Sequence, residues 1–131
     1  MDLQEDKILL KKEVFVKASG ISPIKEESGG KIISLNGRFS LENLPNFSKN
    51  KRRFISEIPE GDFYMKDLIG FWHTHPSHSI PSPPDLYQIL KLNLMSRRNF
   101  LMVIIGKKRI SITEFKNLIF PIIRFEKIKT V

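Results

Sequence analysis

The segment from Leu68 to Ile105 constrains the fold more than any other part of the sequence. Residues 68–75 are rich in apolar side chains and predict a strand, which Pro76 ends because proline cannot donate to a sheet. Residues 85–98 are mostly apolar and contain no glycine or proline, so they predict a buried helix. Residues 100–105 predict a buried central strand. This part of the chain therefore requires a sheet with a long helix packed against it.

The rest of the chain is dominated by short strand patterns. Asn36-Gly37 is a strong hairpin signal. Strands are predicted at residues 31–35, 38–41, 53–56 and 109–113, and one or two more at residues 8–18. Residues 62–66 predict one helical turn. Residues 117–128 predict a last strand, broken at Pro121, whose Phe and Ile side chains between 118 and 125 should belong to the core. The expected class is α+β or α/β, with a mixed, mostly antiparallel sheet and one long helix.

Length and composition exclude several functional classes. A chain of 131 residues predicts a single domain covering residues 1–131. Cysteine is absent, which rules out disulfides, thiolate zinc sites and cysteine nucleophiles and is consistent with the cytoplasm. No run of 18 apolar residues occurs, so we expect no membrane partner. The acidic start, Met1 to Asp6, does not resemble a secretory signal.

Positive charge is concentrated in the last third of the chain. From Arg97 onward, nine Lys and Arg face only Glu114 and Glu126, which gives +7 of the total net charge of +8. Such a surface can attract nucleic acid or an acidic partner. It is also what solvated strand faces look like in a lysine-rich protein. We favour the second interpretation and do not expect nucleic acid to be the main partner.

All three histidines of the chain lie between positions 73 and 78. Alternate residues of a strand share one face, so Ile69, Phe71, His73 and His75 should point the same way while Thr74 points to the opposite side. The two imidazoles would stand about 7 Å apart at their Cα atoms, so both rings could bind one ion. His78 follows in a Ser-His-Ser segment, where it is either an exposed loop residue or a fourth ligand.

Asp85 is the natural third ligand, but it has a competing structural role. Ser82 could be an N-cap, with Pro83 at the first helical position and Asp85 at the third. The two roles are compatible because a helix start can hold its Asp against a metal. A catalytic zinc would also need a general base. Glu26 and Glu27 are the candidates, since they precede two glycines that allow close approach to another strand.

At three places the sequence resembles the JAMM (JAB1/MPN/Mov34) metalloprotease family, whose motif is a Glu, then His-Ser/Thr-His-Pro, then Ser-x-x-Asp. The matching segments are Glu27-Ser28-Gly29-Gly30-Lys31-Ile32-Ile33, Gly70-Phe71-Trp72-His73-Thr74-His75-Pro76 and Pro81-Ser82-Pro83-Pro84-Asp85. The Glu-x-Gly-Gly start and the Gly-x-Trp-His-Thr-His-Pro phrase most resemble the prokaryotic JAB branch. The resemblance covers residues 25–115 and implies a JAMM/MPN-like fold.

The resemblance also implies a role for each motif residue. His73, His75 and Asp85 would bind one Zn²⁺, Glu27 would be the general acid/base, and Ser82 would stabilise the oxyanion. The implied activity is that of a zinc isopeptidase or peptidase. It would direct a zinc-activated water at an amide at the C-terminus of a ubiquitin-like protein or of its conjugate.

Members of the JAB branch often accompany ubiquitin-activating-like and ubiquitin-conjugating-like proteins, some of them in antiphage systems. Those proteins are therefore the implied partners. The alternative function is a non-enzymatic scaffold of the same fold, or a nucleic-acid-associated module that uses the basic last third.

Overall fold

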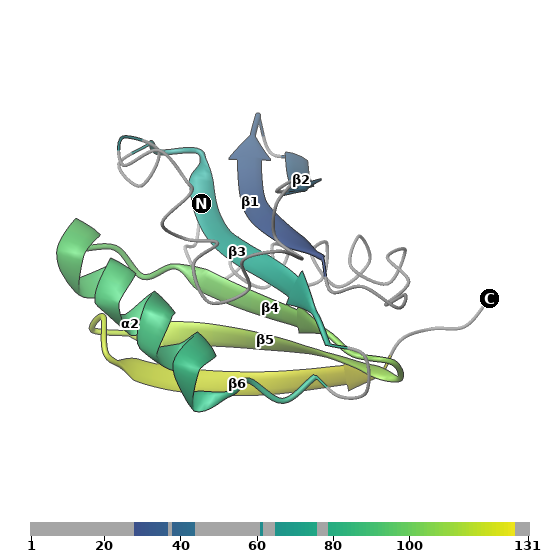
Figure 1. Ribbon diagram of the computed structural model, residues 1–131. Helices are drawn as coiled ribbons and strands as arrows, with labels where there is room; N and C mark the ends of the chain where they lie inside the picture. The colour runs from purple at the N-terminus through teal and green to yellow at the C-terminus, as the bar shows by residue number, and fades with distance from the viewer. Residues whose placement is uncertain (1–27, 37, 44–60, 62–64, 76–78, 128–131) are drawn as a thin grey trace.

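The computed structural model describes residues 28–36, 38–43, 61, 65–75 and 79–127. In chain order its elements are β1 (Gly29–Leu35), β2 (Arg38–Asn43), β3 (Leu68–Thr74), α2 (Pro83–Ser96), β4 (Leu101–Ile105), β5 (Arg109–Lys116) and β6 (Phe120–Lys127). The strands form one six-stranded sheet in the order β2-β1-β3-β4-β5-β6 (Figure 1). Among the strands of the described residues, only the pair β3–β4 is parallel. The predicted mixed, mostly antiparallel sheet with a helix after the histidine loop is confirmed.

The helix α2 connects the two parallel strands. Parallel neighbours need a crossover connection, and α2 provides it by lying against one face of the sheet (Figure 1). The carboxyl end of β3 and the amino end of α2 therefore lie at the same end of the sheet, where the strand β3 finishes. Both predicted ligand segments lie there: the one with His73 and His75 and the one with Asp85.

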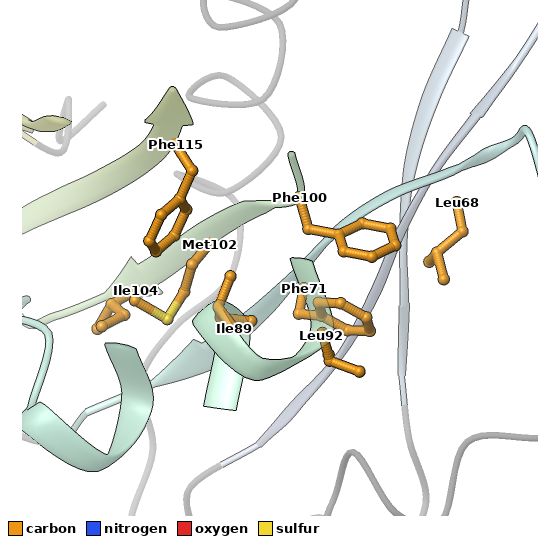
Figure 2. Packing of buried hydrophobic residues seen from close by; sticks show 8 residues of the cluster. All are labelled: Leu68, Phe71, Ile89, Leu92, Phe100, Met102, Ile104 and Phe115. Atoms are coloured by element: carbon orange, nitrogen blue, oxygen red, sulfur yellow. The ribbon is translucent and has the colours of Figure 1, made fainter. Parts of the chain in front are cut away.

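Two apolar clusters, one on each face of the sheet, stabilise the fold. Figure 2 shows the cluster beneath α2, where side chains of the helix and the sheet point toward one another: Leu68, Phe71, Ile89, Leu92, Phe100, Met102, Ile104 and Phe115. The rings of Phe71 and Phe100 meet edge to face, with 5.4 Å between centroids. The opposite face carries the second cluster: Ile32, Phe39, Trp72, Leu101, Val103, Ile105, Ile110 and Ile112. Successive residues of β4 enter alternate clusters, so the predicted central buried strand is confirmed.

The expected alternation along β3 is interrupted once. Ile32 lies opposite Gly70, but Ile33 lies opposite Leu68, so Ile69 is the extra residue of a β-bulge. Ile69 consequently packs on the Trp72 side of the sheet, while Phe71 packs beneath α2. The prediction that Ile69 shares a face with Phe71 is wrong. The bulge lies before Phe71, so the alternation that matters for the histidines is kept.

The predicted helix is present, but it is buried along one side only. The buried residues of α2 are Ile89, Leu92, Asn93 and Ser96, which follow one helical stripe. Tyr87, Leu94 and Met95 are exposed instead. A helix on the surface of a single sheet buries only the stripe that faces the sheet, whatever its composition.

The last strand differs from its prediction in two ways. β6 runs without a break through Pro121, which pairs with Phe115. An edge strand tolerates proline because its outer N–H groups are not needed for pairing within the sheet. The side chains predicted to be core are largely exposed, with Phe120 at 58%, Phe125 at 47% and Ile119 at 45%. Among the described elements, only β5 pairs with β6, so nothing in this part of the chain covers them.

Some predictions fall outside the described residues. These are the strands at residues 8–18 and 53–56 and most of the helical turn at residues 62–66. In the described parts of the chain, no helix is both long enough and apolar enough to cross a bilayer.

Candidate metal site

Three predicted ligands converge at the place where β3 ends and α2 begins. His73 belongs to β3, His75 lies just past its end, and Asp85 is in the first turn of α2. The Nε2 atoms of the two histidines lie 3.0 Å apart. Asp85 Oδ2 lies 3.4 Å from Nε2 of His73 and 3.6 Å from Nε2 of His75. The three residues are close enough to hold a metal ion.

The spacing of these atoms suits a small tetrahedral cation. Metal–ligand bonds of about 2.0–2.2 Å in a tetrahedron separate neighbouring ligand atoms by about 3.3–3.6 Å. Both His–Asp distances, 3.4 and 3.6 Å, fall in this range. The His–His distance of 3.0 Å is slightly shorter, and a small rotation of either ring would correct it. Two imidazoles and a carboxylate are a donor set that zinc accepts.

Backbone pairing on both sides holds the histidines in place. His73 lies opposite Gly29 of β1 and opposite Ile104 of β4. His75 is past the end of β3, yet its N–H still donates to the carbonyl of Ile105 at 2.9 Å. Both rings are therefore carried by backbone that is hydrogen-bonded within the sheet. The His73 side chain is only 4% exposed and that of His75 is 15% exposed.

Asp85 serves the helix and the site with the same oxygen. Ser82 is the N-cap, and its hydroxyl accepts from the N–H of Asp85 at 3.3 Å. In return, the N–H of Ser82 donates to Asp85 Oδ2 at 3.0 Å, which completes a capping box. The predicted cap is confirmed. The two roles proposed for Asp85 are compatible, because the bond from Ser82 holds Oδ2 in place facing the histidines.

The environment of Asp85 favours its charged form. Burial by itself would raise the pKa of this carboxyl group. A hydrogen bond and a charge interaction with His73, together with bonds from the backbone N–H and the hydroxyl of Ser82, outweigh burial and hold the pKa well below its usual range. Asp85 is therefore a carboxylate at neutral pH, which is the form that binds metals.

Ser111 is a supporting residue that the sequence reasoning missed. Its hydroxyl, on β5, donates to the carbonyl of Ser79, and both residues are buried. Ser79 lies in the connection between His75 and Ser82, so this bond ties the ligand-bearing connection to the sheet. The available signal was a small polar residue between two apolar ones, Ile110 and Ile112, in the middle of a predicted strand.

The Gly-Gly segment meets the histidine strand, a contact that sequence spacing alone did not reveal. The N–H of Ser28 donates to Thr74 Oγ1 at 2.8 Å, and the N–H of Thr74 donates to the carbonyl of Ser28 at 2.8 Å. The close approach expected at the glycines is present at Gly30, where a Cβ atom would collide with the main chain of Glu42. Glu26, Glu27 and His78 lie outside the described residues.

The cap makes Ser82 a testable contributor to stability. We expect Ser82→Ala to lower the free energy of unfolding by about 1 kcal/mol, because it leaves the first turn of α2 without its acceptor. Ser82→Gly should cost only a few tenths of a kcal/mol, because glycine is a tolerated N-cap. Urea unfolding of the metal-free proteins measures both. Equal stability of the alanine variant and the wild type would contradict the capping role.

Comparison with known proteins gives no family assignment. No protein-family model matches the chain, and a search of curated proteins found no match. A function for this chain must therefore be argued from its motif residues and from the geometry of the site.

Proposed function

We propose that this protein is a zinc-dependent isopeptidase or peptidase with a JAMM-type site and a JAMM/MPN-like fold. The observation that supports this most is the convergence of His73, His75 and Asp85 at distances of 3.0–3.6 Å. Catalytic zinc sites use three protein ligands and keep one position for water, whereas structural sites use four. The described residues supply three ligands, the number that catalytic sites use.

The three ligands would hold one Zn²⁺. When bound, this ion would supply a water of lowered pKa, near 7, and would polarise the amide carbonyl of the substrate. The chain itself must then move a proton and stabilise negative charge. Glu27 and Ser82 are the proposed residues.

Glu27 would accept the proton of the water and deliver it to the leaving amine. Ser28, the next residue, is hydrogen-bonded to Thr74, and Gly29 lies opposite His73. The Gly-Gly segment therefore runs beside the histidine strand, and its spacing from the glutamates favours Glu27 over Glu26 as the base.

Ser82 would donate a hydrogen bond from its hydroxyl group to the oxyanion. As the N-cap its oxygen accepts one bond from the N–H of Asp85, and a hydroxyl can accept and donate at once. One such donor is typically worth about 3 kcal/mol to the transition state. Ser82→Gly, which keeps most of the stability of the cap, is therefore the variant that isolates this role.

The proposed substrate is the C-terminus of a ubiquitin-like protein, either as a precursor or as a conjugate. Ubiquitin-activating-like and ubiquitin-conjugating-like proteins are the proposed partners, with antiphage defence as one setting. The resemblance of the three motif segments to the prokaryotic JAB branch supports both proposals.

The decisive experiment measures hydrolysis with and without zinc. The full chain, loaded with one equivalent of zinc, is incubated with a ubiquitin-like protein fused through its C-terminus to a fluorescent reporter. We expect release of the reporter, loss of activity on chelation and recovery when zinc is restored. Cleavage that continues unchanged after complete chelation would refute a zinc mechanism.

A further inference from the structure

The outer edge of β6 exposes apolar side chains along an eight-residue strand. Ile123 is 38% exposed and Phe125 is 47% exposed. Long apolar edge strands are usually shortened, covered or protected by charge, because their unpaired N–H and C=O groups invite another strand. Pro121 protects only the beginning of β6. Within the described residues, no strand pairs with the outer edge of residues 123–127.

The two faces of this strand have different chemistry. Ile123, Phe125 and Lys127 lie opposite Thr113, Ser111 and Arg109. They therefore project on the α2 side of the sheet, together with Phe115. Arg124 and Glu126 lie opposite Ile112 and Ile110 and project on the other side. The edge thus has an apolar row on one face and an adjacent cation and anion on the other.

We propose that β6 pairs in antiparallel fashion with β6 of a second copy of this chain, in a register centred on Phe125. A two-fold axis perpendicular to the sheet places one residue of the strand opposite its own copy. With Phe125 at that position, Arg124 of each copy faces Glu126 of the other. Two opposite-charge pairs then form on one face while two phenyl rings meet on the other, and both kinds of cross-strand pair are favourable.

Neighbouring registers lose this complementarity. Centring the pair on Arg124 would set arginine against arginine, and centring it on Glu126 would set glutamate against glutamate. Like charges directly opposite are destabilising. Centring it on Ile123 would leave Arg124 opposite Ile122 and Glu126 opposite Phe120. The charges therefore favour the register centred on Phe125. They also favour a second copy of this chain as the partner, because the charge pattern of β6 is complementary to itself.

Pairing in this way would extend the sheet across both copies. Directly opposed residues of paired strands share a face, so α2 of each copy would lie on the same face of the joined sheet. Both candidate metal sites would then open on that face, with neither of them at the interface. The proposal is therefore independent of the proposed enzymatic function.

The test is a charge exchange followed by sedimentation equilibrium of the full chain. Wild type is expected to dimerise with increasing concentration. Arg124→Glu places glutamate opposite Glu126 in both pairs, and Glu126→Arg places arginine opposite Arg124. Each should raise the dimer dissociation constant by about ten-fold or more, because opposed like charges are costly at an interface. The double variant R124E/E126R restores both pairs and should dimerise like the wild type.

Arg38→Glu is the matched control, since it reverses one charge at an exposed position of β2, which lies at the opposite edge of the sheet from β6. It should leave the dimer intact, and circular dichroism should show that all variants fold. A wild type that stays monomeric at millimolar concentration would overturn the proposal. So would a double variant no more dimeric than the single variants.

Discussion

Replacing His73 with alanine should abolish stoichiometric zinc binding. The ring is buried, and its Nε2 lies within 3.4 Å of both other ligand atoms. Its loss leaves a single imidazole and one carboxylate. Changes to the partners that merely orient a ligand already weaken metal binding by about 10- to 100-fold, so removal of a ligand should exceed 100-fold. Competition with a chromogenic chelator measures the affinity, and the same variant should lose all zinc-dependent hydrolysis.

His78→Ala is the matched control because it removes the only histidine outside the proposed ligand set. It should keep one zinc per chain if His78 is an exposed loop residue. A loss of zinc equal to that of His73→Ala would instead make His78 a fourth ligand and the site structural. Failure of the wild type to bind zinc would reject the metal site itself.

Glu27→Gln should remove hydrolysis while leaving zinc affinity unchanged. Glutamine keeps the size of the side chain but cannot accept the proton of a water molecule at neutral pH. General acid–base catalysis typically contributes about 100- to 10,000-fold, so the turnover number should fall by that factor. Steady-state cleavage of the ubiquitin-like fusion, performed on protein with verified zinc content, is the measurement.

Glu26→Gln provides the comparison that the sequence leaves open. The spacing to Gly29 and Gly30 favours Glu27 as the base. We expect the Glu26 variant to keep wild-type turnover. Full activity of Glu27→Gln would refute the proposed mechanism, and loss of activity in the Glu26 variant alone would assign the base to that residue.

The arrangement of the helix start could be predicted from sequence because its causes are local. Ser82, Pro83 and Asp85 are separated by one to three positions, and capping depends only on backbone groups within that distance. The side shared by His73 and His75 follows from the two-residue period of a strand for the same reason. These local rules correctly described the helix start that carries Asp85 and the shared side of His73 and His75.

The incorrect predictions concern features that depend on the neighbouring strands in the sheet. The bulge at Ile69 depends on how β1 pairs with β3, and the exposure of Phe120 and Phe125 depends on β6 lying at an edge. An apolar strand has the same composition at the centre and at the edge of a sheet. Hydrophobic pattern therefore indicates that a segment can be buried, whereas the strand order determines whether it is.

By itself, the sequence determined the strands, the helix, its cap and the residue types suited to a metal. Only the tertiary structure brought Asp85 Oδ2 to the two imidazoles, placed Ser28 beside Thr74 and tied Ser79 to Ser111. These contacts join residues 10 to 46 positions apart, and their distances depend on the parallel pairing of β3 with β4 and on the packing of α2 over the sheet. Local propensity contains no information about those distances, because they are set by the burial of the cluster beneath the helix.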